Sequence, residues 1–304
     1  MAIKRTLSTV SGPIDAFETA ATKYILGADF QPEQTASYIH VKRLQPFPQD
    51  NPFADLMQRA LSLATELDIP VDGLSGKGAE GNAAAFTAYM TNLSRRLDSL
   101  QERRRKTAEI IEQDRQAIEI LSHIQGVDEN MERFFHLEAV EFRFGRMKQA
   151  IYNRMKDRIE ARTDTLFIPT SIEEDVYAMY FVLPSHKELA DAFFSALRFE
   201  RIYLPETIRG TPAQAAELFQ LDLDRVTRAS AALEDELRTL TLQERQRFSE
   251  HYRYGLLMNE VYSLRAFAAH TEQRFYIVGH IPQIGAEAFA RTVEQEPGFS
   301  CVLA

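Results

Sequence analysis

Two long stretches of this sequence carry apolar residues at alternating steps of four and three, and helices of that length cannot fit inside a small lobe. Residues 82–125 contain neither proline nor glycine. Their apolar stripe has the 3.5-residue spacing of a coiled-coil seam and consists of Phe86, Met90, Leu93, Leu97, Leu100, Ile111, Ile118 and Leu121. Such a helix would be roughly 65 Å long. It can bury its stripe only against a partner helix of similar length.

A second stretch, from Phe219 to Val261, keeps the same rhythm and supplies that partner. Both stripes are interrupted near their middle by polar residues, namely Arg104, Thr107 and Asp114 in the first and Glu244, Arg247 and His251 in the second. We therefore expect residues 81–127 and 212–270 to pair as an antiparallel coiled-coil hairpin. Because its seam is polar in the middle, this bar should bend rather than act as a rigid strut.

The segment between the two helices, residues 128–211, is called the central lobe below. Its pattern predicts strands and helices in the order β-α-β-β-α-β, at 133–144, 146–162, 165–172, 175–183, 185–199 and 200–205. This order is typical of a ferredoxin-like fold. Because it interrupts the hairpin, we expect the central lobe to lie at the distal end of the bar.

The two ends of the chain each supply half of a second ferredoxin-like sheet. The N-terminal part predicts a strand at 4–10, a helix at 13–27 and a strand at 37–44, and the C-terminal part predicts another strand–helix–strand unit. Neither half is large enough to fold alone. Residues 1–80 and 271–304, called the terminal lobe below, should close one proximal lobe. The expected fold class is α+β, with two lobes and a coiled-coil bar arranged as a dumbbell.

Composition and motifs exclude several classes of function. The net charge of −9 argues against a general nucleic-acid binder. A single cysteine, Cys301, excludes an internal disulfide and a cysteine-based zinc site, and it fits a reducing, cytoplasmic compartment. The histidines lack metal-ligand spacing, and no constellation of catalytic side chains is evident. We expect no signal peptide, membrane span, metal, cofactor, small-molecule substrate or enzymatic activity in this sequence.

Basic residues gather on and beside the first predicted helix of the central lobe. They are Arg143, Arg146, Lys148, Arg154, Lys156, Arg158 and Arg162. Two interpretations remain open at this point. The cluster is either a solvated helix face or a docking surface for an acidic helical end of a partner, where such charges would set association rate and partner choice.

The order of these elements, together with two short motifs, resembles a known family. The motifs are Ser11-Gly12-Pro13 after the first strand and FYIVGHIP at 275–282. They are similar to the N-terminal cytoplasmic half of the V-type/A-type ATP synthase subunit called I in prokaryotes and a in eukaryotes. Gly12, Pro13, Gly279 and Pro282 match the pattern of that family, whereas His280 stands where tryptophan is usual.

The resemblance implies a non-catalytic stator, or collar, that ties peripheral stalks to the membrane sector, which translocates protons. In the family the lobes bind the ends of stalk heterodimers called E and G. A central-stalk or rotor-cap subunit is a further candidate partner. The membrane domain of the family has no counterpart in these residues. The implied location is the cytoplasmic face of the membrane.

A rival interpretation is a coiled-coil adaptor or RNA-associated protein that uses a ferredoxin-like lobe for binding, with the basic helix facing phosphate. Against it, the predicted strands of the central lobe lack the aromatic signature of an RNA-binding sheet. We therefore expect no nucleic-acid partner.

Overall fold

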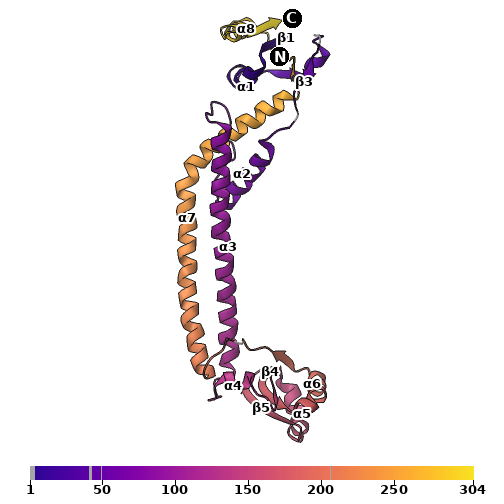
Figure 1. Ribbon diagram of the computed structural model, residues 1–304, viewed down its shortest axis with the longest axis vertical. Coiled ribbons are helices and arrows are strands. Elements are labelled where there is room, and N and C mark those ends of the chain that lie inside the picture. The colour runs from indigo at the N-terminus through magenta and orange to yellow at the C-terminus, as the bar shows by residue number, and fades with distance from the viewer. Residues whose placement is uncertain (1–3, 41–42, 49, 206) are drawn as a thin grey trace. The chain divides into compact units, whose positions relative to one another are not determined.

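The α+β fold class is confirmed by the computed structural model, which describes residues 4–40, 43–48, 50–205 and 207–304 (Figure 1). Two long helices, α3 (Ala83–Ser122) and α7 (Pro212–Arg265), occur together with two antiparallel sheets. The chain divides into two compact units, Met1–Ser99 with Glu236–Ala304, and Leu100–Asp235. Each long helix contributes one half to each unit. The finer three-part division expected from the sequence stays a prediction.

The sheet of the first unit combines strands from both ends of the chain. Its strand order is β10-β1-β9-β8-β3, and β2 also pairs with β9. The bounds are β1 (Arg5–Pro13), β2 (Gln31–Glu33), β3 (Gln45–Pro46), β8 (Ala269–His270), β9 (Arg274–Pro282) and β10 (Ser300–Leu303). Strand β1 lies between β9 and β10, and both pairings are antiparallel. The order β10-β1-β9-β2 is that of a ferredoxin-like sheet.

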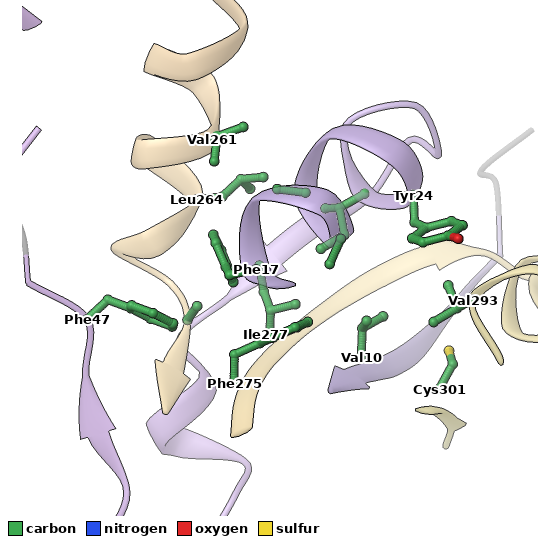
Figure 2. Packing of buried hydrophobic residues seen from close by; sticks show 14 of the residues in the cluster. Val10, Phe17, Tyr24, Phe47, Val261, Leu264, Phe275, Ile277, Val293 and Cys301 are labelled. Carbon is green, nitrogen blue, oxygen red and sulfur yellow. The ribbon is translucent and has the colours of Figure 1, made fainter. Parts of the chain in front are cut away.

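The core of the terminal lobe forms where one helical stretch covers this sheet (Figure 2). The stretch runs through η1 (Ile14–Ala16), α1 (Phe17–Ala20) and η2 (Ala21–Ile25), as the predicted helix at 13–27 requires. Phe17 meets the ring of Phe275 edge-on at 5.3 Å. Helix α8 (Ala286–Glu294) adds Val293 to the same core. Burial of these large side chains is the main source of stability for this lobe.

The strand predicted at 37–44 is wrong. The second strand of this lobe is β2, Gln31–Glu33, and a short helical turn, η3 (Thr35–Ser37), follows it. Residues 41 and 42 of the predicted strand lie outside the described residues. The physical reason is Thr35, which is fully buried. Its hydroxyl accepts a hydrogen bond from the Val278 amide of β9 at 3.1 Å, which fixes the start of η3 against the sheet, so the chain turns here instead of continuing as a strand.

A helix that the sequence analysis did not predict, α2 (Ala54–Glu66), packs against α3. Phe53 stacks on Phe86 with ring centroids 5.8 Å apart. A guanidinium nitrogen of Arg59 lies 3.0 Å from a carboxylate oxygen of Asp98. Residues that were assigned to the terminal lobe therefore line the first half of α3.

Within each unit, α3 and α7 run antiparallel. In the first unit, Tyr89 donates a hydrogen bond of 2.9 Å to Glu244, and the buried stripe includes Met90, Leu93 and Leu97. In the second unit, Leu121 near the end of α3 shares a core with Ala215 near the start of α7. Between residues 101 and 110, every residue of α3 is exposed except the half-buried Thr107. The polar middle predicted from the stripe is thus weakly packed.

The sheet of the central lobe has the order β5-β6-β4-β7, which is also ferredoxin-like. Its strands are β4 (Glu141–Lys148), β5 (Thr165–Ile172), β6 (Asp175–Val182) and β7 (Glu200–Ile202). Helices α5 (Gln149–Glu160) and α6 (Lys187–Ala196) cover one face. The first strand begins later than the predicted residue 133, because Asn130 caps a short helix, α4 (Met131–Phe135), by accepting a hydrogen bond from the Glu132 amide at 2.9 Å.

Candidate partner-binding surface of the central lobe

Arg143, the first residue of the predicted basic cluster, does not face solvent. It lies on β4 with its side chain only 6% exposed, 2.6 Å from Glu141 and 3.6 Å from Asp191. Burial disfavours the charged form of this guanidinium, but the hydrogen bond to Glu141 and the charge of Asp191 outweigh burial and raise its pKa. Arg143 therefore links strand β4 to helix α6 through Asp191. Its buried side chain is out of reach of a partner.

Arg146 and Lys148, farther along β4, are paired with carboxylates of neighbouring strands. Arg146 lies 3.0 Å from Glu200 on β7. The Lys148 ammonium lies 2.9 Å from Asp175 on β6, and the hydrogen bond to Asp175 raises the pKa of Lys148. Because both sites are largely solvated, these ion pairs stabilise the sheet only slightly. They do cancel much of the positive charge that the sequence places here.

Two further members of the cluster are also partly neutralised. Arg162 forms an ion pair with Asp164 and lies over the ring of Phe193, 4.6 Å from its centroid. Lys156 lies 3.8 Å from Glu160, one turn later on α5, in a contact exposed to solvent. Arg162 is thus anchored, whereas Lys156 can still exchange its partner for another acid.

Arg154 and Arg158 are the members that remain open to a partner. Both are exposed on α5, and four residues apart on a helix they lie on one face. In the described part of the chain, no ion pair involves either side chain. Of the seven predicted residues, the structure therefore brings Arg154 and Arg158 together as a cationic surface. Lys156, two residues from each, lies on a different side of α5.

An apolar groove on the same lobe was missed by the sequence analysis. It lies beside strand β5 and has a volume of about 620 Å³. Its lining comes from α4 and the connection to β4, from the start of β5 and the two residues before it, and from the end of β6 and the residue after it. It comprises Phe134, Leu137, Val140, Thr163, Asp164, Thr165, Leu166, Phe181, Val182 and Leu183. We call it the β5 groove. One signal could have revealed it: residues 165–172 are apolar at neighbouring positions, so this strand shows apolar side chains on both faces.

The two glycines of the family-like motifs lie where strands approach closely in the terminal lobe. A Cβ atom on Gly12 would lie 2.8 Å from the ring of Phe275. A Cβ atom on Gly279 would overlap the Phe30 ring and the Gln31 carbonyl, because β2 pairs with β9 at this point. These glycines have a packing role.

The two prolines of the motifs lie at opposite ends of the β1–β9 pair. Pro13 is opposite Arg274, and Pro282 is opposite Arg5. Proline cannot donate a backbone hydrogen bond, so it suits the end of a ladder. His280, at the position where the family has tryptophan, has Nδ1 3.5 Å from a carboxylate oxygen of Glu33.

Several kinds of site are not found in the described part of the chain. No group of three or more histidine, cysteine or acidic side chains is placed to hold a metal ion. Burial raises the pKa of the Cys301 thiol to about 11, which identifies it as a core residue rather than a nucleophile. Among the same residues, no helix combines the length and the apolar character that crossing a membrane requires.

Comparisons with known proteins find similarity among solved structures. No family model and no curated protein matches the chain. Among solved structures, the chain is similar to the crystal structure of the cytoplasmic N-terminal domain of subunit I, homolog of subunit a, of V-ATPase. The TM-score is 0.53 at 14% sequence identity, and the match covers 98% of this chain and 100% of the other. This chain has the subunit I fold. The resemblance expected from the order of elements and two short motifs is thus confirmed by the fold.

Proposed function

We propose that this protein is a non-catalytic stator arm of a rotary V/A-type ATPase, linking peripheral stalks to the membrane sector that translocates protons. One observation carries the proposal: the match to the subunit I domain extends over 98% of this chain and all of that domain. A chance likeness of one ferredoxin-like lobe would cover only a part of each chain. Here the likeness includes both sheets and both long helices.

The physical properties of the chain support a mechanical role. A rotary motor needs static parts that resist torque, and helices α3 and α7 run unbroken for 40 and 54 residues. Each helix carries load along its continuous backbone hydrogen bonds. Such a role requires attachment sites rather than catalytic groups. The protein would act at the cytoplasmic face of the membrane.

The proposed partners of the central lobe are E–G stalk heterodimers. Arg154 and Arg158 are exposed on one face of α5, so they suit the acidic end of a helical stalk. Charges at the rim of an interface mainly raise the association rate and select the partner. A central-stalk or rotor-cap subunit remains a second candidate partner of the same protein.

The test is a titration of the purified chain with the purified E–G heterodimer of the same organism at two salt concentrations. Reversal of both arginines, Arg154→Glu and Arg158→Glu, should slow association several-fold and weaken its salt dependence. A matched control reverses two other exposed arginines of the same unit, Arg115→Glu and Arg228→Glu. The control should bind as the unmodified chain does. Absence of any binding by the unmodified chain would contradict the proposed stalk attachment.

The rival RNA-associated interpretation is less well supported. RNA-binding sheets of this topology stack bases on exposed aromatic side chains. Here Phe144 is buried, and the ring of Tyr177 is stacked on His123 with centroids 3.6 Å apart. The aromatic side chains of the corresponding sheet face are therefore already engaged within the protein. This interpretation would be reinstated if the unmodified chain binds RNA and the two arginine reversals abolish that binding.

A further inference from the structure

We infer that the free edge of strand β10 pairs with the same edge of a second copy of this chain, so that two copies form a two-fold symmetric dimer. The inference goes beyond the proposed function and does not depend on it, because it uses the terminal lobe alone. Three observations support it. Strand β10 lacks the features that protect an edge, its surroundings are apolar, and the neighbouring helix α8 carries charges that complement a second copy of themselves.

Strand β10 differs from the other edge strands that the structure describes. It pairs with β1 on one side and with no described strand on the other. Strands β2, β3 and β5 each contain a proline, which cannot donate a backbone hydrogen bond, and β7 carries Glu200 and Arg201. Prolines and charges of this kind protect an edge from pairing with another chain. The sequence of β10, SCVL at Ser300–Leu303, contains neither.

The pairing of β10 with β1 determines which backbone groups of β10 remain available. The Ala304 amide donates a hydrogen bond of 2.9 Å to the Leu7 carbonyl. Because alternate residues of an antiparallel strand bond to the same neighbour, the even-numbered residues face β1, whereas Cys301 and Leu303 direct their backbone groups outward. In a symmetric antiparallel pair centred on Val302, Cys301 of each copy lies opposite Leu303 of the other. Residues opposed in this way exchange both backbone hydrogen bonds.

Apolar side chains flank this free edge on both faces of the sheet. On the core face, Cys301 lies in one cluster with Val293 of α8 (Figure 2). On the opposite face, Val302 is 63% exposed. An open groove of about 500 Å³ follows the edge and is lined by Glu287, Ala290, Arg291, Cys301, Val302 and Leu303. In the symmetric pair, the two copies of Val302 meet across the two-fold axis, and the apolar surface that they remove from water stabilises the dimer.

The charges of α8 indicate that the partner is a second copy rather than an unrelated strand. Glu287 and Arg291 are 88% and 75% exposed, and both line the groove beside β10. The groove places residues 287–291 beside residues 301–303, so a two-fold axis through Val302 passes near the middle of that part of α8. Glu287 of each copy then lies near Arg291 of the other. Such an isologous contact is self-complementary in charge, and opposite charges across an interface select the partner.

The first experiment measures the mass of the whole chain over a range of concentrations by analytical ultracentrifugation. We expect the unmodified chain to show a monomer–dimer equilibrium. Val302→Lys brings two like charges together across the two-fold axis, and it should weaken dimerisation roughly tenfold or more. Leu242→Lys is the matched control, because Leu242 is 69% exposed on α7 in the same unit and does not line the groove. The control should dimerise as the unmodified chain does.

A second experiment tests the charge pattern of α8. Glu287→Arg and Arg291→Glu each place like charges opposite one another in the symmetric dimer, so each variant alone should dimerise several-fold more weakly. An equal mixture of the two variants should recover the affinity of the unmodified chain, because each copy then offers the charge that the other lacks. The double variant Glu287→Arg/Arg291→Glu should recover it as well.

Three results would overturn the inference. The first is an unmodified chain that stays monomeric at every concentration measured. The second is a dimer that Val302→Lys leaves intact, because its contact would lie elsewhere on the chain. The third is a mixture of the two charge variants that dimerises no better than either variant alone. Each of these results would leave the proposed function intact, because that function rests on the fold comparison.

Discussion

The two lobes share one strand order, but the second strand of the ferredoxin-like sheet differs between them in length and in the side chains that it exposes. In the terminal lobe this strand is β2, which is three residues long with polar ends. The sheet continues beyond β9 through β8 and β3. In the central lobe it is β5, eight residues long with Leu166 and Ile168 exposed. Topology alone therefore does not determine how much apolar surface a lobe leaves exposed. The length and exposed side chains of one edge strand make the difference.

The lobes also differ in how the chain closes them. The central lobe is continuous in sequence, whereas the terminal lobe needs β9 and β10 from the far end of the chain. In the terminal lobe, β9 lies in the middle of the sheet and contributes Phe275 and Ile277 to the core.

The largest expected effect comes from deleting residues 271–304, which should break the terminal lobe and spare the central one. Without β9, the buried faces of Val10 and Phe17 lose their cover. Hydrogen exchange should become fast at residues 5–13 and stay slow at 141–148 and 175–182. Equal protection of residues 5–13 with and without the tail would contradict the sheet register.

A smaller, matched pair of effects is expected at one glycine in each lobe. Gly279→Val should collide with Phe30 and Gln31, and Gly145→Val should collide with Phe199 and the Glu200 carbonyl. Overpacking of this kind costs about 1–3 kcal/mol of unfolding free energy. Chemical denaturation should show a lower free energy of unfolding in both variants. Gly27→Val is the control, since a Cβ atom at Gly27 meets no other atom within 4 Å. Tolerance of valine at Gly279 would show that β2 does not lie against β9.

The smallest expected effect concerns the seam between α3 and α7 in the second unit. Asp114 is 6% exposed, and its Oδ2 has no hydrogen-bond partner among the described residues. Burial and the charge of Asp222 raise its pKa above 3.8, although Arg225 opposes this. The charged form is thus destabilising at neutral pH. Asp114→Asn should raise the free energy of unfolding by about 1 kcal/mol at pH 7.

The sign of the pH dependence follows from the raised pKa. The folded state binds the Asp114 proton more tightly than the unfolded state does. The destabilisation caused by the charged carboxylate therefore disappears as pH falls through the pKa of Asp114 in the folded state. The difference between Asp114→Asn and the unmodified chain should therefore shrink as pH approaches 3.8. Denaturation series at several pH values provide the measurement. A difference that grows on acidification would show that Asp114 has a favourable partner.

Much of the architecture could be predicted because it follows from periodicity. The stripe that includes Phe86 and Leu97 required a long partner helix, and the order of strands and helices in the central lobe required a ferredoxin-like sheet. Strand β2 was missed because three residues containing Pro32 carry no alternation pattern. Helix α4 was missed because its aromatic residues, Phe134 and Phe135, are also strong strand formers.

The candidate site could be predicted only in part. The sequence shows that basic residues cluster but not which of them are already paired, because pairing depends on strand register. Arg146 meets Glu200 from 54 residues away, and Arg143 meets Asp191. The β5 groove was not predicted because it results from incomplete cover of a sheet face by other elements, which no local pattern records.

The most direct test of the central claim is to recover the tagged chain from its own cells and image what it binds. Membranes are solubilised mildly, the chain is purified by its tag, and the particles are examined by electron cryomicroscopy. The proposal predicts a rotary ATPase in which this chain lies in the static part, with its central lobe against the end of a peripheral stalk. Recovery of the chain without any rotary ATPase subunit, or bound to RNA instead, would contradict it.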